Sequence, residues 1–423
     1  MAKQTKPIDP STTLRMTKGG IRITKGGGWG SYLWLIALVL LVGGGLMVYQ
    51  GKPPSTQLPQ ADSGNYQSLI AGRYVTPVAE GLGLITRVKL TPDNNLMLVA
   101  ALTGEVWALA RDGQNWTKQT EPLYMVEHGM DVAGENGMTG LIISGDYTKN
   151  HFVFLTYTEK QADGQGQNQI LRLKVERQGD SYVGAEPTVI FRGNTPVLGA
   201  HQIQGGAGLI WQGKPHLLFA IGEAYHPDYA RTLAREAGKL LLIQEDGSNP
   251  LGVRPYPEYP KIQASGIRNV YDVTTDPINP GWIYFTENGP DTNDMVMRVE
   301  LFNGKRFDFG WNGSADSLLQ PTVDGMIADS LAAYRWEVTV SPVDIVVDRS
   351  GSVYFNIFSS VRYPNKEVVK LVGHDVTAKL EVVASRRAEV TGGNLLGLAT
   401  GTDGSLYFGD MQDGAVYRLW PAK

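Results

Sequence analysis

The chain carries few of the side chains that perform covalent or metal chemistry. Its 423 residues include no cysteine and six histidines. The lack of cysteine excludes disulfides, haem thioether attachment, zinc–thiolate sites, iron–sulfur clusters and thiol nucleophiles. The histidines are scattered, without a spacing such as His-x-x-x-His that would bind a transition metal. The chemistry that remains possible with these residues is acid–base catalysis by histidine, which is the usual base near neutral pH.

The elements that must position such residues are predicted to be β-strands. A polar turn rich in Gly, Asp or Asn is repeatedly followed by a short β-branched and aromatic run, which is the pattern of a turn and a strand. Helical periodicity is scarce, and the best helix candidate is a short one over 228–236 that ends before Gly238. The clearest turn–strand units lie at 91–100, 104–109, 213–220, 281–285, 348–355 and 403–408.

The size of the strand-rich body favours one all-β architecture. Residues 67–423 contain nothing that resembles a linker, and an ordinary β-sandwich is much smaller. Recurrence of the turn–strand unit predicts a six-bladed β-propeller with about 60 residues per blade. Because a propeller closes on itself, we expect the strand over 417–420 to complete a blade that begins near residue 70.

The first 66 residues are predicted to be a membrane anchor and its spacer. Residues 1–28 form a basic tail with six cations and one anion. The whole chain has a formal charge of −4, and this net negative charge argues against nucleic-acid binding. The uncharged apolar run that follows, flanked by Trp and Tyr, predicts a single transmembrane helix over 29–50, with the N-terminus cytoplasmic and the body extracytoplasmic. Residues 51–66, rich in Pro, Gln and Ser, are expected to be an extended linker. The alternative for the apolar run is a cleaved signal peptide.

Four segments, in order along the chain, resemble the glucose/sorbosone dehydrogenase family, and together they cover most of residues 80–420. The most specific part is the pair Gly-Ile-Arg-Asn at 266–269 and Glu-Asn-Gly-Pro-Asp-Thr-Asn-Asp at 287–294. The other matches are Gly-Glu-Asn-Gly-Met-Thr-Gly-Leu at 134–141, His-Gln-Ile-Gln-Gly-Gly at 201–206 with its continuation to 250, and the last strands over 395–419.

The resemblance implies a six-bladed propeller whose catalytic members use pyrroloquinoline quinone and calcium. His201 matches the family's catalytic base, and Arg268 matches an arginine beside the quinone that would stabilise developing negative charge. Gly289 and Pro290 match positions whose backbone carbonyls bind calcium, and Asp294 matches a cofactor-site carboxylate in the same loop. The alternatives are an exposed loop histidine, a structural arginine and a simple Gly-Pro-Asp turn.

The sequence also departs from the family pattern. Three residues separate His201 from the Gly-Gly that follows it, where the family usually has one. Glu135 stands where glucose-oxidising members have a cofactor-binding Gln, and an ionised Glu beside a polyanionic cofactor is unfavourable without a compensating cation. The stretch at 393–398 lacks the arginines that hold the quinone carboxylates. Arg362, or Lys366 in the same loop, could substitute for them.

Three functions remain open on the sequence. The first is a membrane-anchored aldose dehydrogenase that oxidises a sugar or alcohol hydroxyl and passes electrons towards a respiratory acceptor. The second is a propeller that kept the fold, lost the cofactor and binds a glycan or a protein, since fold alone does not carry function. The third is a calcium-dependent lactonase, which needs several carboxylates converging on the central channel.

Overall fold

The computed structural model describes residues 61–126, 130, 135–252, 254–328, 331–373 and 377–422. The predicted basic tail over 1–28, the predicted transmembrane helix over 29–50 and most of the predicted linker over 51–66 lie outside these residues. Within the described residues, no helix is long and apolar enough to cross a membrane. The first strand begins at Tyr66, which is the last residue of the predicted linker.

Strands dominate the described residues and form six sheets, which are mainly antiparallel. The first sheet contains β3 (Ile85–Leu90), β4 (Leu96–Ala101), β5 (Glu105–Asp112) and β6 (Asn115–Lys118), with β7 (Tyr124–Met125) paired to β5. The second contains β8 (Met138–Ile143), β9 (Phe152–Lys160), β10 (Gly166–Gln178) and β11 (Ser181–Val197). The third contains β12 (Ile203–Trp211), β13 (Lys214–Ile221), β14 (Lys239–Gln244) and β15 (Ile262–Ser265), extended by β19 (Phe307–Asp308), β20 (Thr322–Val323) and β21 (Met326–Ile327).

The remaining sheets follow the same plan, and two of them recruit a strand from the start of the body. The fourth contains β16 (Val270–Thr275), β17 (Trp282–Glu287), β18 (Met295–Glu300) and β22 (Ala332–Arg335). The fifth contains β23 (Pro342–Val347), β24 (Val353–Ile357), β25 (Glu367–Val372), β26 (Lys379–Arg386) and β1 (Tyr66–Ser68). The sixth contains β27 (Leu395–Thr400), β28 (Leu406–Asp410), β29 (Ala415–Leu419) and β2 (Val75–Ala79). Among the residues that the structure describes, the helical elements are α1 (Tyr147–Asn150) and the 3₁₀ helices η1 (Pro227–Ala230) and η2 (Ala315–Leu319).

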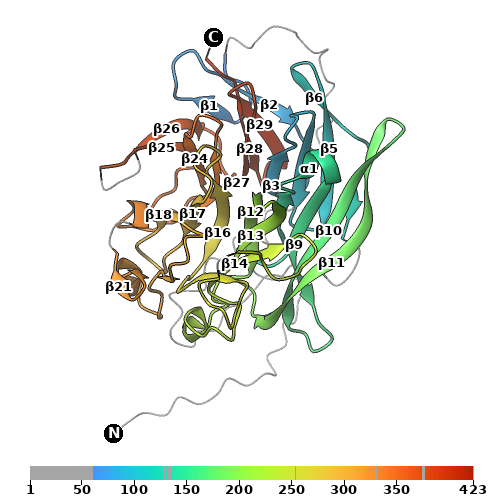
Figure 1. Ribbon diagram of the computed structural model, residues 1–423. Helices are drawn as coiled ribbons and strands as arrows, with labels where there is room; N and C mark the ends of the chain where they lie inside the picture. The colour runs from blue at the N-terminus through green and yellow to red at the C-terminus, as the bar shows by residue number, and fades with distance from the viewer. Residues whose placement is uncertain are drawn as a thin grey trace, which may run out of the picture. The chain divides into compact units, whose positions relative to one another are not determined.

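The sheets are arranged in a ring. One edge strand of each sheet contacts that of the next, in the closed order β3, β8, β12, β16, β23, β27 and back to β3. The sheets extend outwards from these inner strands (Figure 1). Radial packing of antiparallel sheets around a central axis defines a β-propeller. The predicted all-β propeller is therefore confirmed.

Strands from the two ends of the body close the ring. β2 pairs antiparallel with β29, with Val75 opposite Leu419, so the last strand of the chain completes a sheet with residues near position 70, as predicted. β1 pairs with β26, and the Tyr66 ring packs 4.8 Å from the Tyr417 ring of the neighbouring sheet. Because these pairings join residues more than 300 positions apart, they hold the ring shut.

The predicted helix over 228–236 is wrong beyond its first turn. Only the 3₁₀ helix η1 forms there, over Pro227–Ala230. The Lys239 ammonium group donates hydrogen bonds to the carbonyls of Tyr229, Ala230 and Ala237, each at 2.8 Å. The Ala230 carbonyl also accepts the amide of Gly266 at 2.8 Å. The carbonyls that would continue a helix therefore bind tertiary partners instead.

A buried charge network fills the axis of the ring. Nη1 of Arg87 lies 2.9 Å from Oδ1 of Asp344, and Nζ of Lys89 lies 3.4 Å from Oδ2 of Asp272. The two anions balance the two cations, as buried ionic groups require. A Cβ atom at Gly205 would lie 2.0 Å from Oδ1 of Asp272, so only glycine fits where β12 meets this network.

Candidate functional site

The residues matched by sequence to catalytic and cofactor-binding positions lie at one end of the ring. Glu135, His201 and Arg268 immediately precede the inner strands β8, β12 and β16. Gly289 follows β17 and Arg362 follows β24. In an antiparallel sheet the start of one strand and the end of its neighbour meet at the same edge. The topology therefore gathers these residues, although they are distant in sequence.

His201 is paired with a carboxylate that the sequence reasoning did not single out. Its Nδ1 atom lies 2.6 Å from Oε1 of Glu223, and both side chains are buried. Since an ionised carboxylate can only accept a hydrogen bond, it orients the ring with the proton on Nδ1 and leaves Nε2 as the basic nitrogen. The imidazole is also packed 4.7 Å from the ring of Tyr225.

The approach of His201 to Glu223 depends on close backbone packing. His201 has a φ of 53°, in the left-handed region that costs energy for a residue with a side chain. A Cβ atom on Gly222 would lie 2.7 Å from the carbonyl oxygen of His201 and 2.8 Å from its Cβ atom. Glycine at 222 is therefore what lets the end of β13 approach the His201 loop.

Arg268 is held next to this pair through its main chain and its side chain. Its carbonyl accepts the amide of Glu223 at 2.8 Å, which joins the Arg268 segment directly to the histidine's partner. Its Nη1 donates to the carbonyl of Asn288 at 2.7 Å, and its guanidinium lies 5.5 Å from the centre of the Trp311 ring. His201, Glu223 and Arg268 therefore form one connected unit, which contains both predicted catalytic residues.

Glu287 fixes the backbone of the Arg268 segment, and the sequence reasoning gave it no role. Its Oε1 accepts the amides of both Arg268 and Asn269 at 2.9 Å. The side chain is buried, and this burial raises the pKa of Glu287 to about 7. Glu287 is the last residue of β17, so it also connects the Arg268 segment to the Gly289 loop.

The Gly289–Pro290 loop is braced by Asp294. Oδ1 of Asp294 accepts the amide of Gly289 at 2.9 Å, and Oδ2 accepts the amides of Val340 and Ser341, each at 2.7 Å. Burial raises the pKa of Asp294, with these hydrogen bonds opposing the shift. The carboxylate thus ties the loop to the entrance of β23, while its predicted contact with a cofactor stays a prediction.

Arg362 and Glu135 occupy two further positions around this end of the ring. Nη1 of Arg362, on an exposed side chain, donates to the carbonyl of Asp291 at 3.3 Å, which places a cation beside the Gly289 loop. The amide of Glu135 donates to the carbonyl of Gly199 at 2.8 Å, and the Glu135 carbonyl accepts from the side chain of Gln202. Glu135, whose own side chain is exposed, is therefore joined to the loop that carries His201.

An apolar cluster lies near the axis at the same end, and no sequence motif indicated it. Each member begins an inner strand or follows the second strand of a sheet. One member, Leu396, belongs to the stretch at 393–398 in which the family arginines are missing. The members are Leu102, Val343, Leu396 and Met411, with Tyr271 and Phe358 packed against them. The candidate site is therefore polar towards β12 and β16 and apolar towards β23 and β27.

The polar side of the site holds several buried atoms that have no hydrogen-bond partner among the described residues. Such atoms are rare in proteins, and each needs a ligand, a water molecule or an ion. They are Oε1 of Gln202, Oε1 of Gln204, Oε2 of Glu223, Oε2 of Glu287 and Oδ1 of Asn288. A cation or a ligand with several hydroxyl groups would satisfy these oxygens.

The family model of Glucose / Sorbosone dehydrogenase matches residues 85–418, which is most of the chain and contains the whole candidate site. The chain belongs to the glucose/sorbosone dehydrogenase family. Aldose sugar dehydrogenase YliI of Escherichia coli (strain K12) is 25% identical over 224 residues, which are 52% of this chain and 56% of that protein. The chain thus aligns with about half the length of this curated relative.

Solved structures show the same fold. One, described as a glucose dehydrogenase, has a TM-score of 0.67 at 19% sequence identity. The alignment covers 82% of this chain and 99% of that chain. The PQQ-bound form of Aldose Sugar Dehydrogenase from Streptomyces coelicolor has a TM-score of 0.62 at 21% identity, with 84% of this chain and 97% of that chain covered. At these identities the likeness establishes the propeller fold of the family and not the substrate.

The site residues of this family member fit the reacting end of pyrroloquinoline quinone. A buried histidine with an orienting carboxylate lies one hydrogen bond from the Arg268 segment. Arg268 and Arg362 supply positive charge for an anionic cofactor. The carboxylates of such a cofactor would depend on Arg362 or Lys366, since the stretch at 393–398 contains no cation.

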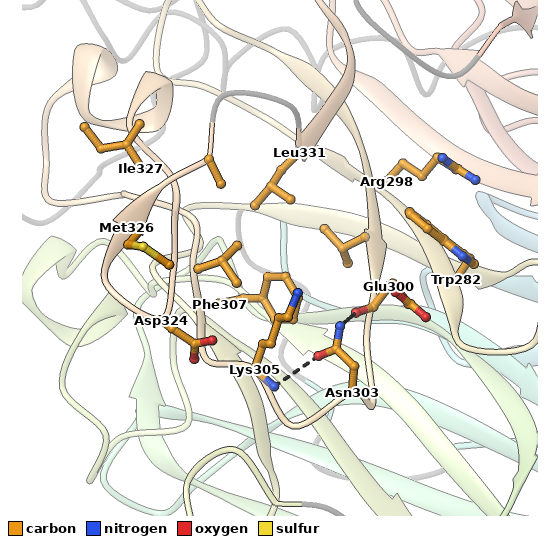
Figure 2. Close-up of a pocket in the computed structure, with 13 residues that line it drawn as sticks. Trp282, Arg298, Glu300, Asn303, Lys305, Phe307, Asp324, Met326, Ile327 and Leu331 are labelled. Carbon is orange, nitrogen blue, oxygen red and sulfur yellow. Dashed lines mark hydrogen bonds between the residues drawn. The ribbon is translucent and has the colours of Figure 1, made fainter.

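A cavity of about 700 Å³ lies elsewhere in this family member, at the far end of β17 and β18 (Figure 2). Trp282 begins β17 and Glu300 ends β18, so the cavity is at the opposite edge of the sheet from Glu287. Phe307 and Met326 complete its apolar wall. This cavity does not belong to the candidate site.

Proposed function

We propose that the protein is a quinone-dependent aldose dehydrogenase that oxidises a sugar or alcohol hydroxyl. The observation that carries the proposal is the His201–Glu223 pair, joined by a backbone hydrogen bond to the segment of Arg268. A base with an orienting carboxylate beside a guanidinium suits removal of a hydroxyl proton next to a centre that gains negative charge. The names of the similar proteins support the same class of activity.

His201 would act as the general base. Because Glu223 holds Nδ1, the Nε2 atom is the one available to take the hydroxyl proton of the substrate. Glu223 would then stabilise the imidazolium that forms, since its negative charge lies 2.6 Å from Nδ1. Pyrroloquinoline quinone, when bound, supplies the acceptor for the hydride that leaves the sugar carbon. Arg268 would stabilise negative charge in the site, as a preorganised cation.

Further residues would hold the cofactor and its metal ion. We assign Arg268 and Arg362 to the anionic groups of the cofactor, with Glu135 at the edge of the site. The carbonyls of Gly289 and Pro290 are the proposed calcium ligands, in a loop kept in shape by Asp294. Calcium would also offset the negative charge of Glu135, which otherwise opposes an anionic cofactor.

The test is a dye-reduction assay on protein loaded with calcium and pyrroloquinoline quinone, with a panel of aldoses and alcohols. His201→Asn should abolish turnover, and Asn tolerates the left-handed backbone at this position. His151→Asn is the matched control, because His151 is a left-handed helix-capping histidine on the loop before β9, outside the site. Turnover by His201→Asn at the wild-type rate, or no turnover by the loaded wild type, would contradict the proposal.

Glu135 and the lack of cations at 393–398 favour a second candidate, a propeller that binds a glycan or protein without catalysis. The stretch at 393–398, where the family resemblance implies arginines for the cofactor carboxylates, contains no cation, so the affinity for the quinone rests on fewer cations. Protein that binds sugar but never the quinone would select this candidate. The lactonase is a weaker candidate, because the described carboxylates at the axis, Asp344 and Asp272, are already paired with Arg87 and Lys89.

The proposed location is the cell membrane, with residues 29–50 as a retained single-pass anchor and the propeller extracytoplasmic. The apolar run and the basic residues before it support this orientation. A respiratory electron acceptor would then be within reach at the membrane. Membrane fractionation with protease digestion of intact cells tests the proposal, because the propeller should be membrane-bound and accessible from outside.

A further inference from the structure

An exposed tyrosine covers the proposed base. The Tyr225 ring lies 4.7 Å from the imidazole of His201, with the two planes at 41°. Tyr225 is 51% exposed to solvent, whereas His201 is only 3% exposed. The Tyr225 ring therefore contacts the imidazole and is also partly exposed to solvent, whereas His201 itself is buried.

The turn that presents Tyr225 is conformationally unfavourable. Ala224 and Tyr225 have φ values of 55° and 59°, and the amide of His226 donates to the carbonyl of Glu223 at 2.9 Å. This is a four-residue turn with two left-handed central residues, a geometry that strongly prefers Asn-Gly. Ala and Tyr at these positions retain strain, which in proteins concentrates at functional sites.

The same turn is firmly anchored, so the tyrosine is not on a loose loop. The amide of Glu223 donates to the carbonyl of Arg268 at 2.8 Å, and the amide of Gly238 donates to the carbonyl of Gly222 at 3.0 Å. Ala224 is buried. The backbone thus fixes the position of the Tyr225 main chain, and from there the ring packs against the imidazole of His201.

We propose that Tyr225 is a specificity-determining residue, a wall and gate over His201 that a sugar substrate must contact to reach the base. The exposed part of the ring offers an aromatic face to the apolar C–H face of a pyranose. Side-chain rotation would uncover the imidazole while the anchored turn stays in place. The identity of the substrate in this inference rests on the proposed function, whereas the covering of His201 by Tyr225 does not depend on it.

The covering is tested by reacting the full-length protein with diethyl pyrocarbonate and measuring the modification rate of each histidine by peptide mass spectrometry. The variants are Tyr225→Asn, which removes the ring and suits a left-handed backbone, and Tyr225→Phe, which keeps the ring. The control is Tyr229→Ala, because Tyr229 stacks on His226 with centroids 4.5 Å apart.

We expect His201 to react about tenfold faster in Tyr225→Asn than in wild type, and at the wild-type rate in Tyr225→Phe. Tyr229→Ala should accelerate His226 alone. The rate of buried His216 reports unfolding and should not change in any variant. An unchanged His201 rate in folded Tyr225→Asn, or a wild-type His201 as reactive as exposed His151, would overturn the inference.

Steady-state kinetics of the loaded enzyme test the specificity. Tyr225→Asn should raise the KM for aldoses by about tenfold with a smaller change in kcat, and Tyr225→Phe should restore the wild-type KM. Equal KM values in wild type and Tyr225→Asn would refute a substrate contact. If the loaded wild type oxidises no sugar, the proposed function fails, while the modification rates still decide whether Tyr225 covers His201.

Discussion

Oε1 of Glu223 lies 2.6 Å from Nδ1 of His201, and both side chains are buried at the end of the ring that carries the loops before β8, β12 and β16. This contact converts a loop histidine into an oriented base, because it fixes the tautomer and offers a counter-charge to the protonated ring. The backbone of Glu223 is in turn bonded to Arg268. The proposed activity depends on these three connected residues.

Glu223→Gln should lower kcat by about 100-fold with little change in KM, because the amide can still accept from Nδ1 but carries no charge to stabilise the imidazolium. The measurement is steady-state dye reduction by the cofactor-loaded protein. Glu245→Gln is the matched control, since Glu245 is another buried glutamate whose carboxylate binds Ser144 and Asn150 outside the site. A Glu223→Gln protein as active as this control would remove the carboxylate from the mechanism.

Arg268→Gln should lower kcat/KM by about 100-fold to 1,000-fold, the usual effect of deleting one preorganised group that stabilises charge. Arg268→Lys should recover only part of this loss, because a lysine cannot keep both the Asn288 carbonyl contact and the planar contact with Trp311. Kinetics of the three proteins with one aldose measure the effect. Full activity of Arg268→Lys would show that the planar guanidinium geometry is irrelevant.

Glu287→Leu should reduce the free energy of unfolding by about 2–4 kcal/mol, because the amides of Arg268 and Asn269 both lose their acceptor. Glu287→Gln should cost much less, since the amide oxygen can accept the same two hydrogen bonds. Urea unfolding followed by tryptophan fluorescence measures both. If the two variants were equally stable, Glu287 would not be what holds the Arg268 segment.

Lys239 should make stability depend on pH. Burial lowers the pKa of Lys239 to about 7, with Asp308 opposing the shift. From pH 7 upwards the unfolded chain keeps a proton that the folded chain releases, so this group should add up to about 1.4 kcal/mol of stability per pH unit until its ordinary pKa is reached. Below pH 7 it should add no slope.

Urea unfolding at pH 7, 8 and 9 tests this expectation against Lys239→Met. The variant should be less stable overall, because three carbonyls lose their donor, and its stability should rise less steeply with pH than that of wild type. Parallel pH profiles for the two proteins would contradict a lowered pKa at Lys239.

The sequence predicted the propeller because its signal is local and repeated. A turn such as the one at 403–405 and the strand β28 after it are encoded within a few residues, and closure through β2 and β29 follows from the architecture. His201 and Arg268 could be singled out because each lies in a recognisable motif. The helix predicted over 228–236 failed because Lys239 and Gly266 bind the carbonyls that it needed.

The rest of the site depends on contacts between residues far apart in the chain. Glu223 is 22 residues from His201. Glu223 follows the end of β13 and His201 precedes β12, and no sequence spacing predicts that two such residues will pair. Glu287 was part of a motif, but its role appears only when its oxygen meets the amides of Arg268 and Asn269. The covering of His201 by Tyr225 requires two left-handed residues that no propensity predicts.

Binding of pyrroloquinoline quinone is tested by a thermal melt of the full-length protein with calcium, with and without the quinone, together with the absorbance of the bound quinone. At 100 times its dissociation constant the quinone should stabilise the fold by about 2.7 kcal/mol, a clear rise in Tm. Arg268→Gln should show a smaller rise. A wild-type protein with neither a higher Tm nor bound absorbance would contradict the account and leave a propeller that binds other partners.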